Sequence, residues 1–284
     1  MDPVIGSLIL STAIHKHRAN TKYKKAKNIS QQAVTKVAEA EMRYEEHQKN
    51  AMVAYESLCT RIAGIAEWLN GPFAAMFRPF ECEDGSYRTD LFGDADIANL
   101  TYIKNIYERR QFQQLPAHKK QTGTSAAVTF LLFGWVGEAN RQLDTAITQR
   151  QISNLVEEQS DTFCMMFDMQ QERYLRVYQL LGALNVALIK TSGTAQTALS
   201  EIEWLLDENG HIPKDMTAEE LRSVVPRNGL NQLTNSINIA KVIMSILKEP
   251  IFDENAEITE TAQKILSEGE EALKRIQTIR QKGR

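Results

Sequence analysis

Histidine and acidic side chains are the residues of this chain best suited to holding a metal ion, so their spacing is informative. The only Glu-x-x-His pattern joins Glu208 to His211. Bundles that hold two iron ions place such motifs in pairs on regular helices. Here Gly210 interrupts the motif in an expected turn, and His15 and His17 are two residues apart, which puts them on different helix faces. The sequence predicts no metal site.

The sequence also lacks complete motifs for binding calcium or nucleotides. Asp207, Asn209 and Asp215 have the side chains of a calcium loop, but the glycine and the final glutamate of that loop do not fall in register. No phosphate loop, dinucleotide fingerprint or nucleophile elbow occurs in the chain. We therefore expect no catalytic, cofactor-binding or metal-binding residue, no small-molecule substrate and no enzymatic activity.

The cysteines and the start of the chain bear on its compartment. Cys59, Cys82 and Cys164 are odd in number and widely spaced, which fits neither a disulfide framework nor a zinc site. The start lacks the pattern of a secretory signal, because Asp2 stands where positive charge is expected and the lysines follow the apolar residues. We expect a cytoplasmic protein with reduced thiols. Peripheral attachment to a membrane and conditional insertion into one are the alternatives to a wholly cytoplasmic location.

Composition and charge set the class of protein and of partner. The chain has 284 residues, of which 43% are hydrophobic and 24% are charged, and this composition is typical of a globular protein with a sizeable core. The formal net charge is −3 and the pI is about 6.0. Proteins that bind nucleic acid through their overall charge are usually basic. We expect no nucleic-acid partner.

Proline placement predicts the fold class. The chain has seven prolines, and six of them fall between long helix-like runs, where proline is tolerated. These six are Pro72, Pro79, Pro116, Pro213, Pro226 and Pro250. The predicted fold is all-α, an elongated bundle of long amphipathic helices, coiled-coil in character, around a central apolar helix or hairpin.

The expected organisation is one bundle built from five consecutive stretches. These are an apolar and basic segment 1–28, a long amphipathic helix 29–72, an irregular connector 73–93, central helices 94–209 that include an apolar segment 122–137, and C-terminal helices 210–284.

The apolar segment Thr122–Gly137 is the most unusual stretch of the chain. Its 16 consecutive residues are uncharged, fewer than the roughly 20 that a membrane-spanning helix needs. A helix that is hydrophobic on every side is either buried all round or in contact with lipid. We expect either a central core helix or a conditional membrane contact through the large apolar side chains Val128, Phe130, Leu131, Leu132, Phe133, Trp135 and Val136.

The N-terminal stretch supplies a second set of candidate membrane contacts. Its first residues place Ile5, Leu8 and Ile9 near one helical face, and a basic run without an acid follows. An apolar face followed by lysines can lie on an anionic membrane, and it also describes a helix end docked on a bundle with solvated lysines. The candidate basic contacts are Lys16, Lys22, Lys24 and Lys25.

Apolar periodicity predicts two long helical regions. A stripe in steps of three and four predicts one helix over Ile29–Leu69, ended by Gly71 and Pro72. Its four-residue steps at Ala33–Val37 and Ala51–Tyr55 are interpreted as interruptions of a heptad, so a nearly straight helix is expected. The run from Gly137 to Asn209 contains no proline.

For that second run we expect either one exceptional helix or, as the favoured interpretation, two helices with a bend near Gly182 or Gly193. The C-terminal part is more regular. Thr217 and Glu220 predict a capping box. Helices are then predicted over Asn228–Lys248 and Ala256–Gln281, separated by a proline.

Two functional hypotheses follow. The first is a membrane-acting or membrane-associated helical protein that shields Thr122–Gly137 in a soluble bundle and forms a pore after oligomerisation. This layout is similar to that of helical pore-forming proteins, and no motif accompanies the similarity. The second is a non-enzymatic structural or adaptor protein whose long helices bind copies of themselves or a helical partner. Expected partners are thus the chain itself, another helical protein, or an anionic membrane.

Overall fold

The computed structural model describes most of the chain, and all of the described part is helix, turn or loop. The described ranges are 3–81, 87, 139–208, 210–213, 215–225, 227–253 and 255–282. They contain no β-strand, only isolated bridges that join Glu81 to Tyr87 and Phe252 to Ile258. The all-α class is therefore confirmed. The first part of the expected central helices, residues 94–138, which includes the apolar segment Thr122–Gly137, lies outside the described residues.

The chain divides into two compact units. Unit 1 comprises Met1–Val53 and His118–Gln171, and unit 2 comprises Ala54–Ala117 and Glu172–Arg284. Two long helices, α1 (Pro3–Trp68) and α4 (Ala139–Ser200), each contribute residues to both units. The remaining described helices belong to unit 2.

Helix α1 is one continuous helix of 66 residues. The boundary expected at residue 28 does not coincide with a helix end. The α-helical part ends at Trp68, one residue before the predicted end at Leu69. Gly71 and Pro72 do not end the helical path, however, because α1 passes into a π-helical turn, Leu69–Phe73, that contains both residues. A proline lacks the N–H of the helical ladder and its ring clashes with the carbonyl four residues back. The wider π turn accommodates this proline, so the chain keeps a helical path.

Helix α4 is likewise continuous, over 62 residues. The favoured interpretation of two helices with a bend near Gly182 or Gly193 is wrong, and α4 ends at Ser200 instead of Asn209. Gly182 serves a packing purpose, because a Cβ atom there would collide with the guanidinium of Arg61 on α1. Glycine is thus used for close approach of a side chain, and the helix passes through it unbroken.

The interior positions of α1 and α4 follow an uninterrupted heptad. In α1, buried or half-buried residues alternate in steps of four and three: Ala26, Ser30, Ala33, Val37, Ala40, Tyr44, His47, Ala51, Ala54, Leu58, Arg61, Ile65 and Trp68. In α4 the steps are three and four: Ala146, Gln149, Ser153, Val156, Ser160, Phe163, Phe167, Gln170, Tyr174, Val177, Leu181, Leu184, Leu188, Thr191 and Ala195. The four-residue step from Ala33 to Val37 is thus part of the heptad, and its interpretation as an interruption is wrong. The step from Ala51 to Tyr55 leaves the heptad, which continues from Ala51 to Ala54 instead.

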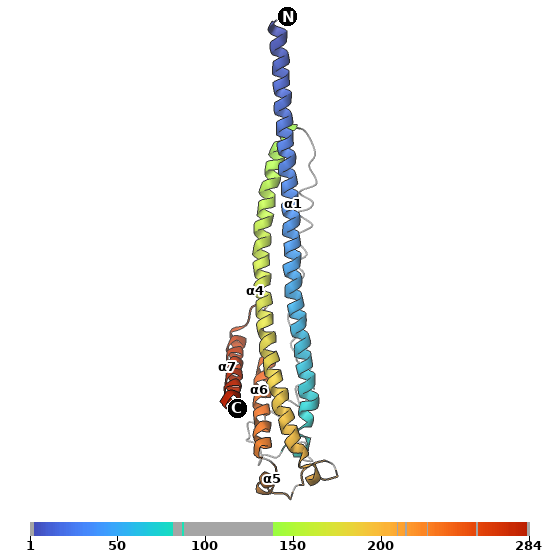
Figure 1. Cartoon of the computed structure of the whole chain (residues 1–284), viewed down its shortest axis with the longest axis vertical. Helices are drawn as coiled ribbons and strands as arrows, with labels where there is room; N and C mark the ends of the chain where they lie inside the picture. The colour runs from blue at the N-terminus through green and yellow to red at the C-terminus, as the bar shows by residue number, and fades with distance from the viewer. Residues whose placement is uncertain are drawn as a thin grey trace. The chain divides into compact units, whose positions relative to one another are not determined.

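In unit 1, α1 and α4 run side by side in the same direction (Figure 1). The residue numbers of interacting pairs increase in the same direction along the two helices, from Lys36 with Glu157 to His47 with Asp168. Small residues are buried between the two helices, and we call the following six the unit-1 seam: Ala26, Ala33, Ala40, Ala146, Ser153 and Ser160. Small side chains let two helix backbones approach closely.

Unit 2 has a core of large apolar side chains instead. The ends of α1 and α4 pack with α5 (Ala218–Val224), α6 (Arg227–Lys248) and α7 (Glu260–Lys282). Among its fully buried side chains are Phe73, Phe77, Phe80, Leu181 and Leu233. The first three lie in the stretch expected as an irregular connector, where a 3-10 helix, Arg78–Phe80, follows the π turn. This described part of the connector belongs to the core.

Local signals near the C-terminus were mostly accurate. The capping box is confirmed, since the Thr217 hydroxyl accepts from the Glu220 amide and the Glu220 carboxylate accepts from the Thr217 amide. Helix α6 begins one residue earlier than predicted. Helix α7 begins at Glu260 and not at Ala256, because Ala256 adopts a left-handed conformation with φ of 59°. Thr259 then caps α7 by accepting a hydrogen bond from the Ala262 amide.

Candidate interaction surfaces

The N-terminal part of α1 is rich in basic residues and contains no acidic ones. No aspartate or glutamate occurs between Pro3 and Ala38. The side chains of Lys22, Lys24, Lys25 and Lys27 are all exposed. No ion pair holds any of the four among the described residues. We call these four residues the lysine cluster.

Continuity of α1 links this cluster to the apolar start of the chain. Helix α1 begins at Pro3 and runs through the lysines without a break. Ile5, Leu8, Ile9 and Lys16 therefore lie on the same helix as the cluster, although their side chains lie outside the described set. At 1.5 Å per residue, the 20 residues from Ile5 to Lys25 span about 30 Å. The remaining candidates, Val128, Phe130, Leu131, Leu132, Phe133, Trp135 and Val136, lie outside the described residues.

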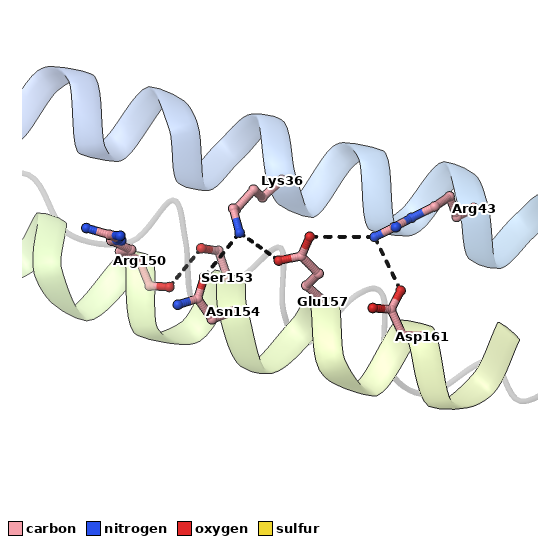
Figure 2. A network of polar contacts seen from close by, with 7 residues as sticks. All are labelled: Lys36, Arg43, Arg150, Ser153, Asn154, Glu157 and Asp161. Carbon is pink, nitrogen blue, oxygen red and sulfur yellow. Dashed lines mark hydrogen bonds and ion pairs between the residues drawn. The ribbon is translucent and has the colours of Figure 1, made fainter. Parts of the chain in front are cut away.

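A polar ladder on one edge of unit 1 fixes the alignment of the two long helices (Figure 2). Lys36 Nζ lies 2.7 Å from Glu157 Oε2 and 3.4 Å from Asn154 Oδ1. Arg43 Nη2 lies 3.8 Å from Glu157 Oε1 and 3.4 Å from Asp161 Oδ1. The hydrogen bond from Lys36 holds the pKa of Glu157 below its usual value. Each cation on α1 therefore meets acids at matched heights on α4, which favours this register.

The interior of unit 1 combines close backbone approach with buried polar atoms. Ser160 Oγ on α4 donates to the backbone oxygen of Ala40 on α1 at 2.8 Å. The Tyr44 ring makes edge contacts with Phe163 and Phe167, at centroid distances of 6.0 and 5.4 Å. Burial raises the pKa of Tyr44.

Several buried polar atoms of unit 1 have no hydrogen-bond partner among the described residues. They are the Tyr44 hydroxyl and the side-chain oxygens of Gln149 and Gln170. Buried polar groups are normally paired, and leaving one unpaired costs about 1–3 kcal/mol. Among the described residues, unit 1 thus has three such atoms, whereas unit 2 has one, the side-chain oxygen of Asn185.

Arg61 is the unexpected polar residue of the unit-2 interior. It occupies a heptad position of α1, where its guanidinium lies 3.8 Å from the centre of the Tyr178 ring and donates to the Tyr178 hydroxyl at 2.6 Å. Gly182, one turn further along α4, leaves room for it. Cation–π stacking and the hydrogen bond together hold this charge in a half-buried position without a carboxylate among the described residues. Sequence periodicity gave no signal for this contact.

The described cysteines sit in surroundings that suppress thiol chemistry. Cys59 is half-buried beside Tyr55, and burial raises its pKa. Cys164 is buried in unit 1. A thiol reacts as its thiolate, so a raised pKa keeps Cys59 in the unreactive form.

Two kinds of site can be assessed from the described residues, metal-binding clusters and membrane-spanning helices. No group of three or more histidine, cysteine or acidic residues within the described ranges has the geometry to hold a metal ion. No helix among the described residues combines the length and apolar character needed to cross a bilayer. Comparisons of the chain with models of protein families, with curated proteins and with solved structures find no match.

Proposed function

We propose that this protein acts at membranes, and that the N-terminal part of α1 attaches it to an anionic membrane surface. The observation that carries the proposal is the lysine cluster, four exposed lysines without ion-pair partners among the described residues, on the same continuous helix as an apolar start. Apolar side chains enter the boundary between head groups and acyl chains, while lysines bind anionic head groups. Each basic residue near such a surface contributes about 1 kcal/mol.

The proposal extends to the apolar segment Thr122–Gly137. Its uncharged, all-round hydrophobic composition suits a helix that is shielded in the soluble protein and meets lipid after a trigger. Oligomerisation of that form would produce a pore. This extension is supported by the sequence of the segment alone.

Liposome flotation tests the surface attachment. The full-length protein is expected to float with vesicles that contain phosphatidylserine and to remain unbound with phosphatidylcholine vesicles. Replacing Lys22, Lys24, Lys25 and Lys27 by Gln should weaken binding by roughly a hundredfold or more, given about 1 kcal/mol per lysine. The matched control replaces four exposed lysines elsewhere, Lys49, Lys241, Lys264 and Lys274, by Gln.

The control has the same change in net charge, so equal loss of binding in both variants would show that only overall charge matters. Absence of flotation for the unaltered protein with any vesicle would rule out the attachment.

A single-tryptophan protein tests the extension to the apolar segment. The chain has three tryptophans, and replacing Trp68 and Trp204 by Phe leaves Trp135 as the only indole. Quenching of Trp135 by brominated lipid is expected if the segment enters the bilayer. Flotation of the protein with no change in Trp135 emission would limit the function to surface attachment.

The second candidate function is a structural or adaptor role. It is favoured by the uninterrupted heptads of α1 and α4 and by large apolar side chains on the outer face of unit 1. On α4 these are Ile147, Leu155, Met165 and Met169, which fall within an arc of about 80° at 100° per residue. A stripe of this kind suits a further helix from another copy or a partner.

Sedimentation equilibrium distinguishes this candidate. Self-association that is lost on replacing Leu155 and Met165 by Lys, but kept on replacing the exposed polar residues Gln32 and Asn50 of α1 by Lys, would support it. A monomer at every concentration, together with no partner recovered from the native cell, would exclude it.

A further inference from the structure

A groove in unit 2 is a feature that the surfaces above leave unexplained. It lies between α4, α6 and α7 and has a volume of about 480 Å³. Pockets for small ligands usually enclose about 300–1,000 Å³. All of its lining residues belong to unit 2.

Packing of α7 explains where the groove opens. At Gly269, an added Cβ would lie 3.4 Å from Leu180 on α4 and 3.4 Å from Ile246 on α6. Helix α7 is therefore in close contact with both neighbours at this glycine. The groove lies on the C-terminal side of that contact, where Ala272 and Ile276 are the α7 residues that face it with apolar side chains.

The groove has an apolar floor. Leu184 of α4 and Ile239 of α6 are buried, and Val242 and Ile276 are half-buried around them. Apolar surface of this kind gains about 25 cal/mol for each Å² that a ligand covers. The floor thus favours a hydrocarbon chain.

The rim is polar and positively charged. Lys190 of α4 and Arg275 of α7 are both exposed at the groove, and no carboxylate is among its described lining residues. Lys190 has no ion-pair partner within the described part of the chain. Arg275 shares its guanidinium with Glu271 at 3.5 Å, and both of these side chains are largely exposed. An exposed pair of this type contributes little and leaves donors free for a ligand.

Three amides of α6 complete the rim. Gln232, Asn235 and Asn238 line the groove and have no hydrogen-bond partner among the described residues. Each side-chain amide offers two N–H donors. In a chain whose net charge is −3, a concave surface with two cations, three amides and no acid is a local exception that selects for negative charge.

We propose that this groove binds a small amphiphile with a hydrocarbon chain and an anionic head, either a carboxylate or a phosphate monoester. The chain covers the floor formed by Leu184, Ile239 and Val242, and the head accepts hydrogen bonds from Lys190 and the α6 amides. A cationic ligand is repelled by the two basic residues. A purely apolar ligand loses the charge-assisted hydrogen bonds, which are the stronger kind. Sequence motifs gave no signal for this groove, because its lining comes from three helices far apart in the chain.

Isothermal titration calorimetry with the full-length protein tests the proposal. The probes are decanoate and decyl phosphate, each below its critical micelle concentration, so that no membrane-like surface is present and the result is independent of membrane attachment. Both probes share the proposed chemistry, and their relative affinity identifies the preferred head. Decanol, which lacks the charge, and inorganic phosphate, which lacks the chain, are expected to bind at least tenfold more weakly than the better amphiphile.

Variants locate the site. Lys190→Gln should lower the affinity for the better amphiphile by roughly tenfold, which corresponds to the loss of one charge-assisted hydrogen bond. Lys264→Gln, on an exposed face of α7, should leave this affinity unchanged. Ala272→Phe should abolish binding by filling the groove. Asn238→Trp obstructs the groove from an exposed rim position without altering the core. It therefore tests the same site even if Ala272→Phe fails to fold.

Cross-linking gives an independent location. Decanoate with a diazirine in its chain should label peptides that contain Leu184–Thr194 or Gln232–Val242. No binding of either amphiphile, equal binding of decanol, or labels confined to other peptides would overturn the proposal. So would equal losses for Lys190→Gln and Lys264→Gln.

Discussion

Ser160 of α4 donates a buried hydrogen bond to the backbone oxygen of Ala40 of α1, at 2.8 Å. A serine side chain is short, so this bond requires the two helix backbones of unit 1 to lie close together. Ala40 is fully buried and Ser160 nearly so. The contact therefore sets the spacing of the helices, and residues larger than alanine or serine do not fit at this level of the unit-1 seam.

The first prediction concerns that spacing. Ala40→Leu should lower the free energy of unfolding by about 1–3 kcal/mol, because overpacking forces the helices apart, and it also separates Ser160 from its acceptor. The control is Ala38→Leu at an exposed position of the same helix, where the change should be within about 0.5 kcal/mol. Urea unfolding followed by circular dichroism at 222 nm measures both. Equal effects of the two variants would contradict the close approach.

The second prediction concerns the direction of the helices. Lys36 Nζ and Glu157 Oε2 are 2.7 Å apart, so a carbodiimide should join them with a zero-length amide bond. Mass spectrometry of the digest should show this cross-link in the unaltered protein and not in Glu157→Gln. An antiparallel pair matched at Ala40 and Ser160 would place Lys36 beyond Ser160 along α4. A cross-link from Lys36 to Asp168 would therefore refute the parallel arrangement.

The third prediction uses two glycines of one helix. Gly193 of α4 has nothing within 4 Å of an added Cβ, whereas Gly182 meets the guanidinium of Arg61. Gly193→Ala should raise the free energy of unfolding by about 1 kcal/mol through helix propensity. Gly182→Ala should not, because its methyl group displaces Arg61 from the Tyr178 ring.

A double-mutant cycle separates these two effects. In the Arg61→Ala background the obstacle is gone, so Gly182→Ala should then stabilise by about 1 kcal/mol, as at Gly193. Identical behaviour of Gly182→Ala with and without Arg61 would mean that the stacking arrangement imposes no constraint.

Regular features of the sequence were sufficient to predict much of the fold. Local chemistry identified the capping box of Thr217 and Glu220, and apolar periodicity identified α6 to within one residue of its start. Both signals act over a few residues and do not depend on distant parts of the chain. The all-α class could be predicted because a proline also acts locally, by ending or interrupting a helix where it stands.

Features that depend on distant residues could not be predicted. From the sequence alone, Gly182 is interpreted as a bend in the helix. In the structure it leaves space for the side chain of Arg61, which is more than 100 residues away in sequence. The parallel direction of α1 and α4 depends on which residues meet between them, and no single-helix pattern encodes that. The heptad of α1 was hard to recognise because Tyr55 and Ile62 add apolar residues outside the heptad positions. Both pack against the unit-2 core.

The candidate sites show the same division. The lysine cluster was visible as a run of basic residues without acids, and its exposure agrees with that pattern. The groove of unit 2 was not visible, since Lys190, Asn235 and Arg275 come from three separate helices. Only the packing of those helices gathers their side chains around one hollow.

The fourth prediction concerns alkaline pH. Burial, reinforced by the neighbouring Cys59 thiol, raises the pKa of Tyr55 to about 12 from an ordinary value of 10.0. Burial also raises the pKa of Cys59 above its ordinary value of 9.0. The folded protein therefore holds these protons more tightly than the unfolded chain does. Between about pH 9 and pH 12 the unfolded chain binds fewer protons, so the free energy of unfolding falls as the pH rises.

Urea midpoints measured from pH 8 to pH 11 test this dependence. The midpoint should fall above about pH 9, and Tyr55→Phe should make the fall less steep because one of the shifted groups is removed. Tyr23→Phe is the control, since Tyr23 is exposed on α1. A slope that is unchanged by Tyr55→Phe would contradict the contribution of this phenol.

The fifth prediction concerns the cap of α5. Thr217→Ala removes the hydroxyl that accepts from the Glu220 amide at 3.2 Å, and loss of an N-cap costs about 1 kcal/mol. Leu221 and Val225 anchor α5 in the unit-2 core, so the helix should remain docked while its first turn opens more often. Hydrogen exchange should therefore accelerate at the amides of Glu219 and Glu220 and stay unchanged across α6. Thr217→Ser keeps the accepting oxygen and should preserve the slow exchange, and acceleration in Thr217→Ser equal to that in Thr217→Ala would show that the methyl group, and not the cap, protects this turn.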